Sequence, residues 1–336
     1  MGYAREKEKI AKKRKRIWLI SLVVLALFIS AICVLMSISN PTTWKYKVFL
    51  PNVAERGEGE LRVHFIDVGQ GDATLIELPD GKTMLIDGGN GDDNANKSLL
   101  RHINALDIEK IDYLVLTHAD NDHFGGLIEL LKQKNVERAF LPITTIEEEK
   151  SSPYSRFLTE LAKEDCAVEK ANVFASHALS NQTNYTLAFL YPYTSMTDGV
   201  VEQPVGNDAS VVVWLEYINV SFLFTGDATK ETESSLIASQ EKGLYALYGV
   251  DIRKTKILKV AHHGSDDSTS EEFLTYIGVG EAVISCGEDN PYGHPDKAVL
   301  ERLMGIGAKI HRTDTDGSII VTVGIDGAYR FETLDK

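Results

Sequence analysis

The chain has 336 residues and a hydrophobic content of 43%, which is enough for one large domain or two ordinary ones. The net charge is −14, but residues 1–50 hold 10 Lys and Arg against two Asp and Glu, so residues 51–336 are at −22. A surface this acidic repels polyanions except where a metal ion or a local basic patch reverses the field. Only two cysteines, Cys166 and Cys286, follow residue 50, without the C-x-x-C spacing of a zinc site.

The N-terminus predicts a membrane anchor. Residues 1–16 are strongly basic, and no charged residue occurs from Ile17 to Trp44. This run exceeds the roughly 20 apolar residues that span a bilayer. By the positive-inside rule, residues 1–16 form a cytoplasmic tail, residues 17–39 span the membrane, and the rest lies outside. A cleaved signal peptide is the alternative, but its apolar region usually has only about 7 to 15 residues.

A β-meander is expected after the anchor. Residues 40–60 contain two prolines and two glycines and read as a tether. Strands are expected at 61–66, 73–78 and 83–86, joined by glycine-containing turns. Asp87 follows the third strand, where an aspartate more often orients a metal ligand than binds the metal itself. A helix is expected at 98–106.

The segment from Leu114 to Leu127, LVLTHADNDHFGGL, is the densest in chemistry. A buried strand over 113–116 delivers His118, Asp120, Asp122 and His123 into a polar loop that two glycines close. Imidazole suits zinc, iron or manganese and carboxylate suits harder ions, so this mixture indicates an open catalytic metal site rather than a closed thiolate site. A solvated acidic loop with two chance histidines is the alternative.

Further acid and imidazole side chains follow later strands. Asp227 comes directly after a strand over 221–224, and His262 and His263 follow a strand over 257–261. Since strand ends converge on one rim of a sandwich, these residues predict one pocket. The remaining pattern predicts strands at 139–142, 185–191, 210–217, 281–285, 309–312 and 318–323, and helices at 127–134, 155–165, 230 into the 240s, 271–277 and 296–304. This order suits an α/β fold of two sheets packed face to face with helices outside.

Eight segments resemble a known family. They are FIDVGQGD (65–72), LIDGG (85–89), THADNDHFGG (117–126), NDAS (207–210), FTGD (224–227), KVAHHGS (259–265), YGHP (292–295) and RTDTDG (312–317). Together they resemble the metallo-β-lactamase-like domain of bacterial DNA-internalisation competence proteins (ComEC-like), in the variant whose metal loop reads H-x-D-x-D-H. The resemblance covers about residues 61–325 and implies a four-layer αββα sandwich over 61–336.

The resemblance also implies a site for up to two divalent ions, zinc or manganese. The implied ligands are His118, Asp120, Asp122, His123, Asp227 and His262, with Asp227 between the two ions. Asp122, His263 and His294 are the implied catalytic residues, and His263 or His294 would donate a proton. Where the superfamily usually has a further histidine, this chain has Asn207 and Asp208, so whether Asp208 is a ligand stays open. His64, His102, His177 and His311 lack ligand partners nearby in sequence and read as structural.

The implied function is a membrane-anchored, extracytoplasmic metal-dependent hydrolase. A competence-type nuclease or phosphodiesterase is the first expectation, with a phosphodiester substrate, DNA among the candidates, and the lipid bilayer contacted through the N-terminal helix. A hydrolase of cell-envelope phosphodiesters, such as phosphorylcholine on teichoic acid, is an alternative that the acidic balance favours. An inactive surface module is the third. With one apolar segment, the chain cannot form a DNA channel by itself.

Overall fold

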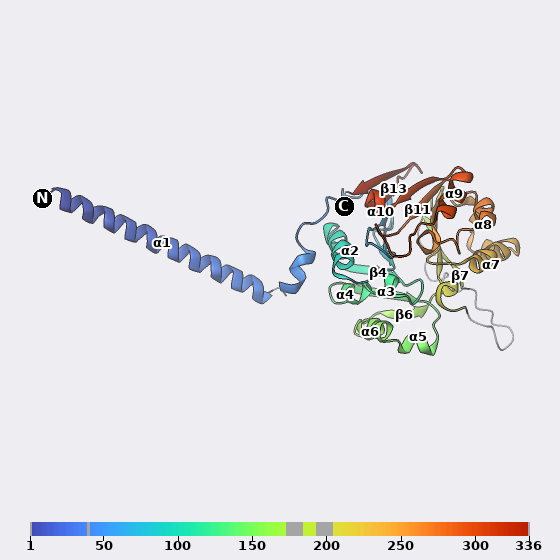
Figure 1. The fold of residues 1–336 in the computed structure, drawn as a ribbon, viewed down its shortest axis with the longest axis horizontal. Helices are drawn as coiled ribbons and strands as arrows, with labels where there is room; N and C mark the ends of the chain where they lie inside the picture. Colours follow the sequence, from blue (N-terminus) through green and yellow to red (C-terminus); the bar gives the residue numbers. More distant parts are fainter. Residues whose placement is uncertain (1, 39–40, 173–183, 193–203, 335–336) are drawn as a thin grey trace. The chain divides into compact units, whose positions relative to one another are not determined.

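The computed structural model describes residues 2–38, 41–172, 184–192 and 204–334. The chain divides into two compact units, Met1–Val48 and Phe49–Lys336. The first unit is mainly helical, and the second holds two β-sheets with their flanking helices (Figure 1). Each unit has its own contacts and is considered separately below.

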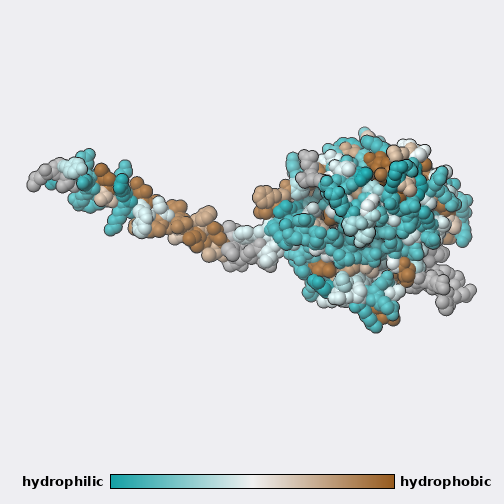
Figure 2. Space-filling model, viewed as in Figure 1, coloured by the Kyte–Doolittle hydropathy of each residue, from teal (hydrophilic) through white to brown (hydrophobic). Residues whose placement is uncertain are grey.

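The first unit consists of α1 (Gly2–Ile38) and the short 3₁₀ helix η1 (Pro41–Tyr46). Within α1, the segment Arg5–Val34 is long and apolar enough to cross a membrane. Figure 2 shows the apolar residues gathered toward the C-terminal half of this helix. The basic tail continues into the apolar segment as one helix. A signal sequence near the N-terminus can meet the same criterion, so retention of the anchor and its orientation stay predictions.

The first sheet of the second unit has eight strands. Their order is β14 (Tyr329–Leu334), β13 (Ser318–Val323), β1 (Leu61–Phe65), β2 (Thr74–Glu77), β3 (Thr83–Ile86), β4 (Lys110–Val115), β5 (Asn135–Leu141) and β6 (Ala167–Lys170). Pairing is antiparallel from β14 to β3 and parallel from β3 to β6. The predicted meander is therefore present as β1, β2 and β3.

The second sheet has six strands. Their order is β12 (Lys309–Arg312), β11 (Glu281–Ile284), β10 (Ile257–Lys259), β9 (Val220–Phe224), β8 (Val212–Tyr217) and β7 (Tyr185–Tyr191). Strands β9 to β12 are parallel. Because parallel strands end on the same edge, the residues that follow β9 and β10 are brought together.

The two sheets bury one apolar core between them. Phe65 and Phe140 from the first sheet lie in the same cluster as Phe189, Phe222 and Phe224 from the second. Fully burying each such side chain contributes about 1.5–3 kcal/mol. A separate cluster packs the other face of the six-stranded sheet against the helices α7 (Lys230–Glu241), α8 (Glu271–Ile277) and α9 (Lys297–Gly305).

The other helices complete the layers. Figure 1 shows α2 (Asp93–Ala105), α4 (Leu127–Leu130) and α6 (Ser152–Leu161) grouped beside β4 and β6, away from α7, α8 and α9. Three further short helices, α3 (Asn121–Phe124), α5 (Ile146–Lys150) and α10 (Thr313–Asp316), lie in connecting segments. The αββα fold predicted from the sequence is confirmed.

Two edge strands were not predicted. In β14, four of the six residues are exposed and two are half-buried, and three of the four residues of β6 are exposed. An edge strand has one partner and needs no continuous apolar run, so its sequence signal is weak. The helix expected at 98–106 begins earlier, at Asp93, where the Asp92 carboxylate caps it.

Four histidines were predicted to be structural, and three of them form side-chain contacts away from the candidate ligands. His64 Nε2 is 3.0 Å from Glu77 Oε1, and His102 Nε2 is 2.9 Å from His64 Nδ1. Burial lowers the pKa of both imidazoles, although Glu77 acts in the opposite direction and raises the pKa of His64. His311 Nε2 is 2.7 Å from Glu281 Oε2. His177 lies outside the described residues.

Candidate metal centre

The candidate site lies where strands from both sheets end. His118 follows β4, and α3 then presents Asp122 and His123. Asp227 follows β9, and His263 follows β10 in the 3₁₀ helix η6 (Ala261–Gly264). Residues far apart in the sequence thus meet in one place, as the positions at strand ends predicted.

The backbone near the site adopts conformations that side chains usually avoid. Asp87, His262 and His263 have φ of 61°, 49° and 53°. Left-handed non-glycine residues cost on the order of 1–3 kcal/mol each and cluster at functional sites. Gly226 has φ of 52°, and a Cβ there would lie 2.9 Å from Thr117 Cβ, so only glycine fits before Asp227. These unusual backbone conformations direct the side chains of Asp87, Asp227, His262 and His263 at the ends of their strands.

The centre contains two overlapping groups of side chains. His123 Nε2 lies 3.3 Å from Asp227 Oδ1, and His118 Nε2 lies 3.8 Å from Asp227 Oδ2. On the other side, His263 Nε2 lies 3.3 Å from Asp122 Oδ2 and 3.5 Å from Asp227 Oδ2. Three ligand atoms close enough to hold one ion come from His118, His123 and Asp227 in the first group and from Asp122, His123 and His263 in the second. Asp227 faces both groups, which is the place of a carboxylate shared between two ions.

The donor set fits divalent ions. Nε2 of His118, His123 and His263 and Oδ1 of Asp227 are buried without a hydrogen-bond partner among the described residues. Leaving a buried polar group unsatisfied costs about 1–3 kcal/mol. Four such atoms converging in one place are explained by a ligand that accepts imidazole nitrogen and carboxylate oxygen, which is what zinc and manganese do.

The pKa shifts of the pocket residues also indicate a site for a positive ion. Burial favours the neutral forms, but Asp227 and Asp87 hold the pKa of His123 well above its usual value. Likewise the pKa of His263 rises to about 10, because Asp227 and Asp72 outweigh burial. Against burial, His123 and His263 lower the pKa of Asp227 well below its usual value. The carboxylates therefore attract positive charge, which a divalent ion supplies once it has displaced the imidazole protons.

Asp87 orients His123. Its Oδ2 is 2.8 Å from His123 Nδ1, and its Oδ1 accepts a 2.8 Å hydrogen bond from the Thr117 backbone N–H. With Nδ1 engaged in this way, Nε2 of His123 is directed at Asp227. This is the orienting role that the sequence favoured for Asp87 over direct ligation.

Two residues behind the ligands were missed. Asp72 and Lys259 are both 3% exposed and form an ion pair, and Asp72 Oδ1 is 3.5 Å from His263 Nδ1. Asp72 ends the DVGQGD segment and Lys259 begins KVAHHGS. A lysine inside an otherwise apolar strand segment was the available signal, but nothing in the sequence shows that it meets Asp72.

The geometry reverses the sequence-based roles of His262 and His263. The sequence favoured His262 as ligand and left His263 as a proton donor. In the structure His263 is 2% exposed and its Nε2 faces Asp122 and Asp227. The His262 side chain is 22% exposed, its Nδ1 lies 2.9 Å from Asp267 Oδ1, and its Nε2 lies 3.7 Å from Asp227 Oδ2. Position and burial therefore favour His263 as the ligand.

This difference gives a testable expectation. His263→Ala should lower metal affinity by more than about 100-fold, the upper range for loss of an outer-shell partner, whereas His262→Ala should retain its metal. Metal content after dialysis against a defined free-ion concentration measures both. His311→Ala controls for loss of a buried imidazole away from the site. Greater metal loss from His262→Ala than from His263→Ala would restore the sequence-based assignment.

The other predicted residues lie farther out. The Asp120 side chain is 55% exposed and 3.7 Å from His118 Nε2, at the rim of the site. The Asp208 carboxylate accepts a hydrogen bond from the Thr229 hydroxyl and belongs to none of the ligand groups found among the described residues. His294 lines the pocket, stacks on Tyr292, and has a pKa lowered by burial.

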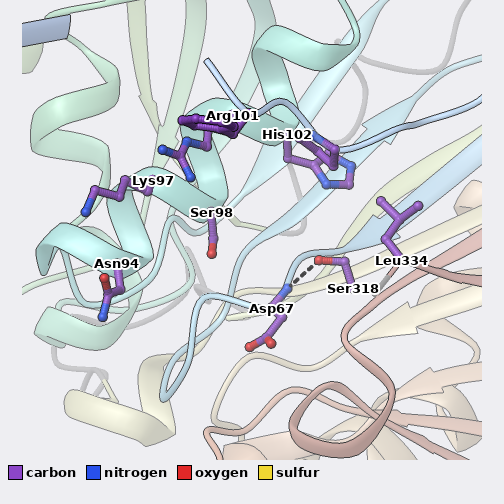
Figure 3. A pocket seen from close by; sticks show the side chains of 10 residues that line it. Asp67, Asn94, Lys97, Ser98, Arg101, His102, Ser318 and Leu334 are labelled. Atoms are coloured by element: carbon purple, nitrogen blue, oxygen red, sulfur yellow. Dashed lines mark hydrogen bonds between the residues drawn. The ribbon is translucent and has the colours of Figure 1, made fainter. Parts of the chain in front are cut away.

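Two hollows near the site differ in their lining. The site pocket has a volume of about 190 Å³ and is lined by Gln70, Asp120, Asp122, Asp227, His262, His263, Tyr292 and His294. A larger hollow of about 710 Å³ lies along α2, where Lys97, Ser98 and Arg101 face Asp67 and Ser318 (Figure 3). Among the described residues, three of the four groups that could hold a metal include a residue that lines the smaller pocket, and none includes a residue that lines the larger hollow.

Comparison with known proteins is consistent with this geometry. The profile of the metallo-beta-lactamase superfamily matches residues 66–149. "ComE operon protein 3" of Bacillus subtilis is 30% identical over 277 residues, covering 78% of this chain and 33% of that protein. "Recombination protein 2" of Haemophilus influenzae is 30% identical over 263 residues, covering 77% and 28%. The chain thus spans about a third of the length of these relatives.

Among solved structures, the metallo-beta-lactamase fold protein YhfI from Bacillus subtilis has a TM-score of 0.46 and 12% identity, covering 81% of this chain and 100% of that one.

Proposed function

The chain belongs to the metallo-beta-lactamase superfamily, with homology to part of the competence proteins, and on this premise we propose that it is a metal-dependent phosphodiesterase. The observation that carries the proposal is the convergence of unpaired, buried nitrogen and oxygen atoms at strand ends of both sheets. The relatives are named as competence and recombination proteins, which supports a nucleic-acid phosphodiester as substrate.

In this proposal the residues of the site have separate metal-binding and orienting roles. His118, His123 and Asp227 would hold one ion, and Asp122 and His263 would hold the other together with His123. Asp227 faces both groups and would compensate the charge of both ions. When bound, such ions bring the pKa of water towards ~7 and stabilise negative charge on phosphoryl oxygens. Asp87 keeps His123 in the ligating orientation through its 2.8 Å contact with Nδ1.

His294 is the proposed proton donor to the leaving oxygen. It lines the same pocket as the ligands, and its Nδ1 is buried without a partner among the described residues. Burial lowers the pKa of its imidazole, and an anionic phosphodiester bound beside it would oppose this shift. Bound substrate would thus favour the protonated imidazole, which is the form that donates a proton.

The direct test compares the metal-loaded and chelated full chain in detergent. Substrates are single-stranded DNA, duplex DNA, a nitrophenyl phosphodiester and a phosphorylcholine ester. We expect hydrolysis that chelation abolishes and that added zinc or manganese restores. Full activity in a metal-free preparation, or no hydrolysis of any substrate by the metal-loaded chain, would refute the proposal.

Leaving-group dependence tests the role of His294. Nitrophenolate needs little protonation to depart, whereas an alkoxide needs a proton. His294→Ala should therefore slow cleavage of an alkyl phosphodiester by about 10²–10⁴-fold while largely sparing the nitrophenyl substrate, with metal content unchanged. Equal losses on both substrates, or loss of metal, would instead place His294 in the binding shell or the fold.

The acidic surface favours a second candidate substrate class. With residues 51–336 at −22, a long polyanion is repelled, whereas a cell-envelope phosphodiester that also carries a cationic group is not. The substrate panel above separates the two candidates. Faster turnover of the phosphorylcholine ester than of DNA at equal ionic strength would select the envelope substrate.

The proposed location is the outer face of the cell membrane, with α1 retained as a single span. The basic stretch before the apolar segment supports this orientation. Protease added to intact cells should then remove the second unit. Digestion only after lysis would refute the orientation.

A further inference from the structure

Gln70 is a polar side chain at the metal pocket that none of the roles above uses. It lies in the loop between β1 and β2, between Gly69 and Gly71, and lines the same 190 Å³ pocket as the candidate ligands. Its Nε2 is buried and has no hydrogen-bond partner among the described residues. A buried amide donor left unpaired costs about 1–3 kcal/mol, so its presence needs an explanation.

The orientation of the Gln70 amide is fixed by its other end. Oε1 accepts a 3.1 Å hydrogen bond from the Gly287 backbone N–H. An N–H can donate only to the oxygen of an amide, so the NH₂ group must be the end that is left over. The NH₂ group carries two donors. The other polar side chains that line the pocket are three carboxylates, three imidazoles and one tyrosine hydroxyl.

The loop that carries Gln70 is held in place from two sides. A Cβ at Gly71 would lie 2.4 Å from the carbonyl oxygen of Asp122, and the Asp72 N–H donates to that same oxygen over 3.2 Å. On the opposite side, a Cβ at Gly287 would lie 2.6 Å from the Gln70 backbone nitrogen. The loop therefore packs directly against the candidate metal loop, and the amide cannot turn away without losing its hydrogen bond from Gly287.

From this geometry we infer that Gln70 is a catalytic residue whose Nε2 donates a hydrogen bond to a phosphoryl oxygen of the substrate. The inference rests on the proposed phosphodiesterase function and adds a substrate-binding group to it. A preorganised neutral donor at this place stabilises the charge that develops on a non-bridging oxygen without competing with the ligands for metal. It also accounts for the unpaired buried donor.

Two substitutions separate this role from a structural one. Gln70→Glu keeps an oxygen for the Gly287 N–H but replaces the donor with a second acceptor. Gln70→Met keeps the length of the side chain and loses both functions. If Gln70 only held Gly287, the Glu variant would behave like the wild type and the Met variant would be impaired. If Gln70 binds a phosphoryl oxygen, both variants should be impaired, and Glu at least as severely because its charge repels the phosphate.

Gln240 provides a matched control. Its Oε1 accepts a 3.0 Å hydrogen bond from the Ile252 backbone N–H, so it performs the same structural task outside the pocket. Gln240→Met should reproduce any general effect of losing a glutamine-to-backbone contact. It should leave phosphate binding and turnover unchanged.

The experiment uses the metal-loaded full chain in detergent and measures inorganic phosphate binding by calorimetry, together with metal content and turnover of a phosphodiester. Both Gln70 variants should retain metal and weaken phosphate binding by about 10- to 100-fold, as expected for a hydrogen bond to a charged group. Their turnover should fall by about 10²–10³-fold.

Phosphate affinity and turnover at the wild-type level in Gln70→Glu would overturn the inference and leave the phosphodiesterase proposal standing. Metal loss from both Gln70 variants would also overturn it, since the residue would then act on the metal. If the metal-loaded wild type neither binds phosphate nor hydrolyses a phosphodiester, the proposed function fails, and the role of Gln70 fails with it.

Discussion

Asp227→Asn should abolish hydrolysis of every phosphodiester and reduce bound metal at the same time. Asp227 is the carboxylate that faces both ligand groups, with oxygens 3.3 Å from His123 Nε2 and 3.5 Å from His263 Nε2. Asparagine keeps the shape but removes the charge that would compensate two adjacent cations. The expected loss of metal affinity exceeds about 100-fold, which is the upper range for losing an outer-shell partner. Metal analysis and turnover of nitrophenyl and alkyl substrates measure the effect.

Asp208→Asn is the matched control for this change. It is the same substitution beside the same site, but its carboxylate engages the Thr229 hydroxyl rather than the ligands. Metal content and turnover should stay within a factor of a few of the wild type. A selective loss of activity on the alkyl substrate by Asp227→Asn, with metal retained, would contradict the bridging role and would point instead to proton transfer.

The residues that the sequence predicted at the site and that the structure brings together share one property. His118, Asp122 and His123 lie within six residues, and Asp227 directly follows an apolar strand, so their proximity follows from strand ends meeting on one edge. No knowledge of how distant segments pack was needed. The αββα layers were predictable for the same reason, because strand and helix patterns alternate in the order that two covered sheets require.

Other features depend on contacts that a linear pattern does not contain. Which of two adjacent histidines points inward is decided by two successive left-handed residues, His262 and His263, whose conformation no propensity predicts. Asp72 lies in the loop between β1 and β2 of the first sheet, and Lys259 ends β10 of the second sheet, so their ion pair joins two segments that are distant in the sequence. Edge strands β6 and β14 escaped notice because one exposed face leaves them without an apolar run.

The ion pair between Asp72 and Lys259 gives the second large expected effect, on stability. Both side chains are 3% exposed, so removing one partner leaves the other buried. Breaking a buried pair in this way typically costs about 3–5 kcal/mol. The two single changes should not be equal. Lys259 has Asp72 as its one carboxylate partner among the described residues and otherwise only the Gly226 carbonyl at 3.3 Å.

Asp72, by contrast, keeps other positive partners when Lys259 is replaced. His263 Nδ1 is 3.5 Å and His123 Nδ1 is 3.9 Å from its carboxylate. Asp72→Asn should therefore destabilise the fold by about 3–5 kcal/mol, and Lys259→Met by less. The double variant should lose less than the two single changes added together, since neither charge is then left alone. Urea unfolding of the chelated full chain in detergent measures all three, with the exposed Lys297→Met as a control expected to show no change.

The pH dependence of this effect has a definite sign. Burial would raise the pKa of Asp72, but Lys259 and His263 hold it below its usual value of 3.8. A carboxyl whose folded pKa is depressed contributes stability above the unfolded pKa and loses that contribution as the pH falls through the folded pKa. The destabilisation by Asp72→Asn should therefore be full near neutral pH and shrink below about pH 3.8. A difference that stays constant well below that pH, or a larger effect from Lys259→Met than from Asp72→Asn, would show that Asp72 acts through its shape and hydrogen bonds rather than through its charge.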